Sequence, residues 1–116
     1  MEYNGIIELL FKTRKEELYD NLIQQLEKDF LLANVPLELN KTILPDQLLT
    51  LIKEKLYVLL MESFDVYLNL LYIIDVPENS LKHIRSADAV EVAEQASFLV
   101  LKRECEKVIL KKQFGG

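Results

Sequence analysis

The stretch that decides the fold is Leu56–Ile74, LYVLLMESFDVYLNLLYII, in which the polar residues are Glu62, Ser63, Asp65 and Asn69. A helix that is apolar on nearly every side has to be surrounded by other elements. Pro45 is well placed in the first turn of such a helix, because a helix start needs no amide donor there. We therefore predict one central helix from Pro45 to Asp75, a rod roughly 45 Å long at about 1.5 Å of rise per residue.

The composition of the whole chain favours helices. The sequence has 116 residues, the length of one ordinary domain, and half of them are hydrophobic, with three glycines and three prolines. This is too apolar for a disordered chain and too poor in turn residues for many short strands. We predict an all-α fold in a single domain over residues 1–116, a helical bundle of three long helices plus one short helix, with the long apolar helix at its centre.

Charge and cysteine content limit the partners and the compartment. The net charge of −5 would repel a phosphate backbone, so nucleic acid is disfavoured as a ligand. Ionised Glu62 and Asp65 near the middle of the apolar run argue against a membrane span. The first residues lack the basic start of a secretory signal, and the single Cys105 fits a reducing compartment. We expect a cytoplasmic protein that binds neither nucleic acid nor membrane.

The first segment, from about Glu2 to Leu32, has two apolar faces that point about 140° apart around a helix axis. The polar run KTRKEE, Lys12 to Glu17, lies between them. Either the helix breaks in this run, or it stays straight and buries its two halves against different neighbours. Asn34 can take the left-handed position after the helix, and Pro36 prevents its continuation. The apolar connection over residues 33–44 is expected to lie across the core.

Two further helices are expected after the central one. Asp75 and Glu78 have capping-box spacing around Pro77, which predicts a short helix ending near Ile84. Ser86 or Asp88 then starts the last helix, which runs to about Gln113.

This last helix also carries two apolar faces about 140° apart. Together with the first segment and the central helix, that is more apolar surface than one chain of this length comfortably hides, and self-association would cover it. We predict a homo-oligomer, most simply a homodimer. The predicted interface consists of the second faces, formed by Tyr3, Ile7, Leu10 and Phe11 in the first helix and by Leu101, Cys105, Val108 and Ile109 in the last.

Two acidic motifs suggest a different chemistry. They read EELYD, Glu16 to Asp20, and ESFD, Glu62 to Asp65. Here the chain resembles the all-α nucleotide pyrophosphohydrolases of the MazG kind, which carry EExxE on one helix and ExxD on another; Asp20 stands where that family has a glutamate. The resemblance implies a Mg²⁺ ion held by Glu17, Asp20, Glu62 and Asp65 that activates water for attack on a phosphate. The other interpretation is that these carboxylates solvate outward helix faces.

The function that the sequence favours is therefore non-enzymatic. We predict a helical protein-protein interaction module, a self-associating scaffold, an adaptor or an immunity-type partner, with no cofactor and no resident metal. Its acidic surface would favour a basic partner protein besides a second copy of itself. The alternative is a Mg²⁺-dependent nucleotide pyrophosphohydrolase built on the two acidic motifs.

Overall fold

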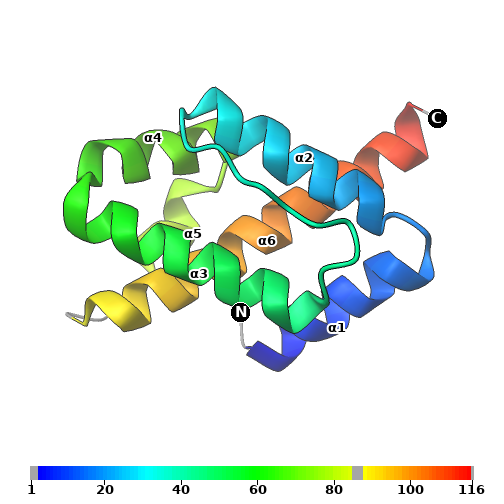
Figure 1. The fold of residues 1–116 in the computed structure, drawn as a ribbon, viewed down its shortest axis with the longest axis horizontal. Coiled ribbons are helices and arrows are strands. Elements are labelled where there is room, and N and C mark those ends of the chain that lie inside the picture. The colour runs from blue at the N-terminus through cyan, green and yellow to red at the C-terminus, as the bar shows by residue number, and fades with distance from the viewer. Residues whose placement is uncertain (1–2, 85–87, 116) are drawn as a thin grey trace.

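The computed structural model describes residues 3–84 and 88–115, and these residues form helices and connecting segments (Figure 1). The helices are α1 (Tyr3–Lys15), α2 (Tyr19–Leu32), α3 (Pro45–Glu62), α4 (Phe64–Ile74), α5 (Glu78–Lys82) and α6 (Ala89–Phe114). The prediction of an all-α fold is confirmed. The predicted number of helices is wrong, because the first segment is divided into α1 and α2 and the central segment is divided into α3 and α4.

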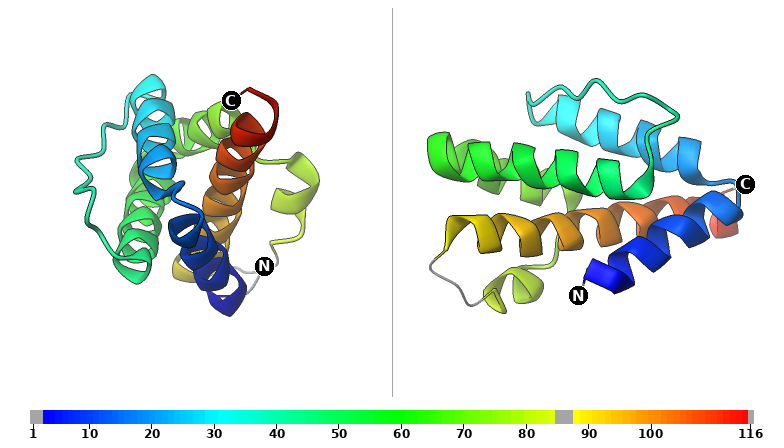
Figure 2. Two further views of the ribbon diagram at one scale, coloured as in Figure 1. Left: turned by 90° about the vertical axis from the view of Figure 1, so that its right-hand side faces the viewer. Right: turned by 60° about the horizontal axis from the view of Figure 1, so that its bottom comes forward.

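Helix α6 is the element around which the others pack. It is the longest helix, with 26 residues, and it contacts α1, α2, α3 and α4 (Figures 1 and 2). The small residues Ala93, Ala96 and Ser97 are fully buried, which lets neighbouring helices approach its first half closely. The centre of the bundle is therefore the last helix and not the apolar segment from Pro45 to Asp75.

That apolar segment folds back on itself at Ser63. Its backbone there has φ −149° and ψ 68°, which ends α3 and lets α4 start in a new direction. Figure 1 shows α3 and α4 as the two arms of a hairpin, and Leu56 of α3 and Leu70 of α4 are fully buried in the same core. A straight rod of this length would have left one half without neighbours, so the predicted continuous helix is wrong. Pro45 does start α3, and the segment does end at Ile74.

The first segment breaks at Glu17, which settles the alternative left open by its two apolar faces. Glu17 has a left-handed backbone with φ 62°. The Leu18 N–H donates to the Thr13 carbonyl at 2.9 Å, and the Glu17 N–H donates to the Arg14 carbonyl at 3.0 Å. These are the two hydrogen bonds of a Schellman turn, in which the residue after the left-handed one packs inward. Leu18 is buried accordingly.

Asn34 and Asp75 end α2 and α4 with the same turn. Their φ angles are 66° and 69°. The left-handed position predicted for Asn34 is confirmed, whereas Asp75 was predicted to cap the next helix. Instead, Asp75 follows α4, and its carboxylate accepts a hydrogen bond from Arg103 of α6 at 3.1 Å. For the last helix, Asp88 is the residue that caps the start, accepting from the Val90 N–H at 2.9 Å; Ser86 lies outside the described residues.

The connection over residues 33–44 lies on the core, as predicted. Val35 and Leu37 are buried, and the Tyr19 hydroxyl donates to the Ile43 carbonyl at 2.7 Å. Figure 1 shows this segment crossing the front of the molecule between α2 and α3. Within residues 3–84 and 88–115, no helix combines the length and the apolar character needed to cross a membrane.

Candidate functional site

The predicted interface residues occupy different places in the structure. Leu10, Leu101, Cys105 and Val108 are buried in the core of the single chain. Ile7 and Ile109 are half-buried against that core, Phe11 is exposed, and the side chain of Tyr3 lies outside the described part of the chain. The inference that these apolar faces need a second copy to cover them is therefore wrong for the four buried residues. Different helices of the same chain pack on the different sides of α6.

Cys105 illustrates this internal role. The Thr13 hydroxyl of α1 lies 3.7 Å from its sulfur, at a point where α1 crosses α6. Burial raises the pKa of the Cys105 thiol to about 11, so the thiol stays protonated at neutral pH. Cys105 is a core residue and an unreactive one.

The two acidic motifs do not meet. Glu16, Glu17 and Asp20 lie at the α1–α2 turn, while Glu62 and Asp65 flank the α3–α4 turn at the opposite end of the molecule (Figure 1). All five side chains are exposed. Among the residues that the structure describes, no group of three or more histidine, cysteine or acidic side chains could hold a metal ion. The ligand set that the pyrophosphohydrolase resemblance requires is therefore not assembled.

A chain of polar side chains, buried over most of its length and exposed at Lys111, joins α2 to α6. We call it the polar seam; its members are Gln25 and Asp29 of α2 and Glu104, Lys107 and Lys111 of α6. Lys107 Nζ donates to Asp29 Oδ2 at 2.8 Å and lies 3.4 Å from Glu104 Oε2. Gln25 Nε2 donates to Asp29 at 3.1 Å, and its Oε1 accepts from Lys111 at 2.6 Å. The seam fixes the register of the two helices with directional contacts.

The two carboxyl groups of the seam have opposite protonation states. Burial, reinforced by the neighbouring Asp29, raises the pKa of Glu104 to about 9, so this fully buried group is protonated at neutral pH. Burial opposes ionisation of Asp29 as well, but hydrogen bonds from Lys107, Glu104 and Gln25 outweigh it and lower the Asp29 pKa. The Lys107 ammonium, 3.4 Å from Glu104 Oε2, opposes this shift without cancelling it, and a protonated Glu104 can donate to Asp29.

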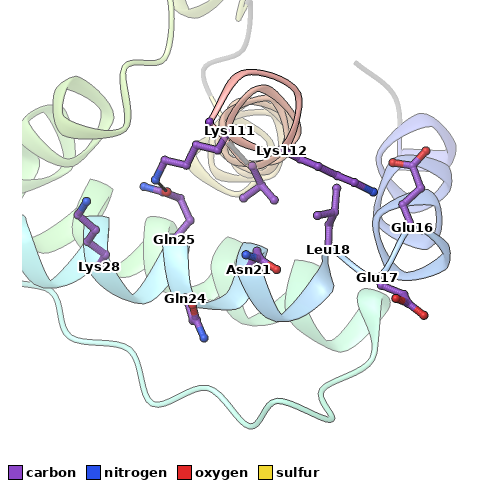
Figure 3. Close-up of a pocket in the computed structure, with 11 residues that line it drawn as sticks. Glu16, Glu17, Leu18, Asn21, Gln24, Gln25, Lys28, Lys111 and Lys112 are labelled. Carbon is purple, nitrogen blue, oxygen red and sulfur yellow. Dashed lines mark hydrogen bonds between the residues drawn. The ribbon is translucent and has the colours of Figure 1, made fainter.

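A groove of about 670 Å³ opens beside the exposed end of the seam (Figure 3). It lies between α2 and the last turns of α6 and is closed at one end by the α1–α2 turn. Lys28 and Lys111 stand at one end of it and Glu16 and Glu17 at the other, as Figure 3 shows. Leu18 and Val108 form an apolar floor. The volume is in the range of protein binding sites, and the groove is more basic than the chain as a whole.

A second surface, which we call the hairpin face, consists of Met61, Phe64, Leu68 and Tyr72. Phe64, Leu68 and Tyr72 follow one another at a spacing of four residues, so they share one side of α4. They are 54%, 48% and 82% exposed. Phe64 is held in place by stacking on the buried Tyr67, with ring centroids 5.7 Å apart. The hairpin face is an apolar stripe that no described element covers.

Neither the polar seam nor the hairpin face was identified from the sequence. The polar seam had one signal: Gln25 and Asp29 fall on the same helix face as Leu22 and Leu26, where a buried stripe would be expected to be apolar. The hairpin face depends on the turn at Ser63, for which the sequence has no proline or glycine.

Comparison with known proteins gives no relative for this arrangement: no family model, no curated protein and no solved structure matches the chain. The functional argument therefore rests on the geometry described above.

Proposed function

We propose that this chain is a non-enzymatic protein-binding module that associates with further copies of itself through the hairpin face, in the manner of a scaffold, an adaptor or an immunity-type partner. The observation that carries the proposal is the row of Phe64, Leu68 and Tyr72 on the solvent side of α4. Large apolar side chains exposed together mark contact sites more often than surface of ordinary composition does.

The local structure supports such a role because it prepares the surface for contact. Stacking on Tyr67 holds the Phe64 ring in one orientation, so little side-chain entropy remains to be lost on association. Val58 and Met61 of α3 are also exposed, and a depression of about 390 Å³ lined by Val58 and by Val90 of α6 lies between those two helices. Exposed aromatic and methionine side chains are a common composition for the centre of an interface.

The charges around the hairpin face favour a basic partner. Glu62 and Asp65 flank the turn at Ser63 and are exposed beside the apolar stripe. A partner that covers Met61 and Phe64 would bring its own side chains next to these carboxylates, and basic ones would be attracted to them. The pyrophosphohydrolase alternative has no comparable support, because its carboxylates lie at opposite ends of the molecule.

Analytical ultracentrifugation of the purified chain tests this proposal. The sedimentation coefficient of the natural sequence should rise over roughly a hundredfold range of concentration as the oligomer forms. Phe64→Asp should keep the protein monomeric, because it places a charge at the centre of the proposed contact. Phe11→Asp is the matched control, since Phe11 and Phe64 are 52% and 54% exposed. It should associate like the natural sequence.

A natural chain that sediments as a monomer over the whole range would overturn the proposal. So would a Phe64→Asp variant that associates as strongly as the Phe11→Asp control.

A further inference from the structure

We infer, building on the self-association proposed above, that one copy seats the turn of its α3–α4 hairpin in the groove of the next copy, so that association is head to tail. The inserted part, which we call the hairpin tip, consists of Met61, Glu62, Phe64 and Asp65. The receiving site is the groove between α2 and the end of α6. The occupant of the groove is therefore a second copy of this chain.

Charge complementarity is the first argument. The hairpin tip presents two exposed carboxylates, Glu62 and Asp65, next to two exposed apolar side chains. The groove presents Lys28, Lys111 and Lys112 around an apolar floor. In a chain of net charge −5, lysines gathered around one groove are a local exception. Opposite charges on the two surfaces would orient the encounter and discriminate against other pairings.

The helix ends around the groove are also basic. The last turns of α1 and α6 carry Lys12, Arg14, Lys15, Lys111 and Lys112. The acids Glu16 and Glu17 stand at the α1–α2 end of the groove, away from Lys28 (Figure 3). The basic end, formed by Lys28 and Lys111, is therefore where the acidic tip would lie. The floor formed by Leu18 and Val108 would receive Met61 or Phe64.

The positions of the two surfaces require a second copy. The longest dimension of the molecule is 39 Å, and the hairpin turn and the α1–α2 turn lie at its two ends (Figure 1). A single chain cannot bring its own tip to its own groove. Two different surfaces that fit one another at opposite ends generate a head-to-tail contact, which leads to a ring or an open chain of copies.

The polar seam gives the groove a fixed shape before binding. Lys111 donates to Gln25, Gln25 donates to Asp29, and Asp29 accepts from the largely buried Lys107. This series of contacts holds one lysine ammonium at the basic end of the groove, so less side-chain freedom is lost when a carboxylate arrives.

The test uses two variants that each lose one surface. Phe64→Asp damages the tip and leaves the groove intact. The variant Lys28→Glu reverses a charge at the basic end of the groove, leaves the tip intact and touches no member of the polar seam. Lys41→Glu is its control, because this exposed lysine lies outside the groove and the net charge changes equally. Circular dichroism establishes that all variants are folded.

Head-to-tail association predicts that each damaged variant alone associates at least about tenfold more weakly than the natural chain, while the control does not. Mixing the two should then give a 1:1 complex that does not grow, because one intact tip meets one intact groove. A groove variant that self-associates like the natural chain would overturn this inference and leave the proposed function standing. A mixture that stays monomeric would also overturn it. A natural chain that never associates would instead refute the proposed function on which the inference rests.

Discussion

The polar seam and the hairpin face depart from ordinary protein anatomy in opposite directions. In the seam, four ionisable side chains are placed between α2 and α6, and two of them, Asp29 and Glu104, are buried. On the hairpin face, Phe64, Leu68 and Tyr72 are placed in solvent. Buried charge is tolerated only when partners inside the chain satisfy it, and here Lys107 and Gln25 do so. Exposed apolar surface has no partner within the described chain, so its partner is expected outside.

This difference separates residues that stabilise the fold from residues available for contact. Changes in the seam should lower stability, whereas changes on the hairpin face should affect association and leave stability nearly unchanged. The following experiments test that separation, beginning with the largest expected effect.

Removal of the seam's central cation should be the most damaging change. Lys107→Met keeps the length of the side chain but leaves Asp29 buried without its ammonium partner, and we expect a loss of about 3 kcal/mol in the free energy of unfolding. Lys53→Met is the matched control, because the Lys53–Glu94 ion pair at 3.0 Å is partly exposed at both ends. It should lose roughly 0.5 kcal/mol. Urea unfolding measures both, and equal losses would contradict the assignment of a structural role to the seam.

The stacked rings of Tyr67 and Phe64 in α4 should have different roles. Tyr67 should stabilise the fold, and Phe64 should contribute mainly to association. Tyr67 is 4% exposed, and Tyr67→Ala should lower the free energy of unfolding by about 3 kcal/mol through the cavity it leaves. Phe64→Ala removes the outer ring and should cost about 1 kcal/mol or less, since mainly the stacking contact is lost. Association should nevertheless weaken in Phe64→Ala. Urea unfolding together with sedimentation of the same samples makes the comparison, and a larger stability loss for Phe64→Ala would reverse our reading of this helix.

The proton on Glu104 should make the free energy of unfolding fall as the pH rises above the ordinary pKa of a glutamate. Its pKa is about 9 in the folded chain against an ordinary value of 4.5, so the folded state holds a proton that the unfolded state has lost between these limits. The contribution is complete below the lower value and is lost as pH rises, at about 1.4 kcal/mol per pH unit. Glu104→Gln keeps a neutral hydrogen-bond donor toward Asp29 and should remove this slope.

Urea unfolding at about pH 6 and about pH 8.5 measures that slope, and the variant should be the more stable protein at the higher pH. Asp29 does not interfere in this range, because its lowered pKa places its own contribution at acid pH. Equal slopes for the variant and the natural chain would show that Glu104 is ionised in the fold.

The sequence predicts the ends of several helices because those signals are local. Pro45 starts α3 and Asn34 ends α2 through backbone preferences that need no tertiary information. The hairpin could not be predicted in the same way. An almost uniformly apolar segment can be buried either by surrounding neighbours or by folding back, and Ser63 alone does not decide between the two.

The internal role of the α6 faces and the polar seam were both missed for a related physical reason. Two apolar faces on α6 indicate that it has neighbours on two sides, but they do not say whether those neighbours belong to the same chain. Here α1, α2, α3 and α4 supply them, so Leu101 and Val108 are internal. Pairing of Lys107 with Asp29 joins residues that are far apart in sequence, and only the crossing of α2 and α6 brings them together.

The smallest expected effect concerns the turns that create the two regions. The turn beside the groove holds Glu17 at φ 62°, a left-handed conformation that is unfavourable for a residue with a side chain, whereas the hairpin turn holds Ser63 at φ −149°, which any residue can adopt. Glu17→Gly should therefore raise the free energy of unfolding by about 1 kcal/mol. Ser63→Gly should lower it slightly, because glycine adds freedom only to the unfolded chain there. Thermal unfolding followed by circular dichroism measures both, and a loss of stability in Glu17→Gly would mean that the exposed Glu17 side chain contributes more than its backbone strain removes.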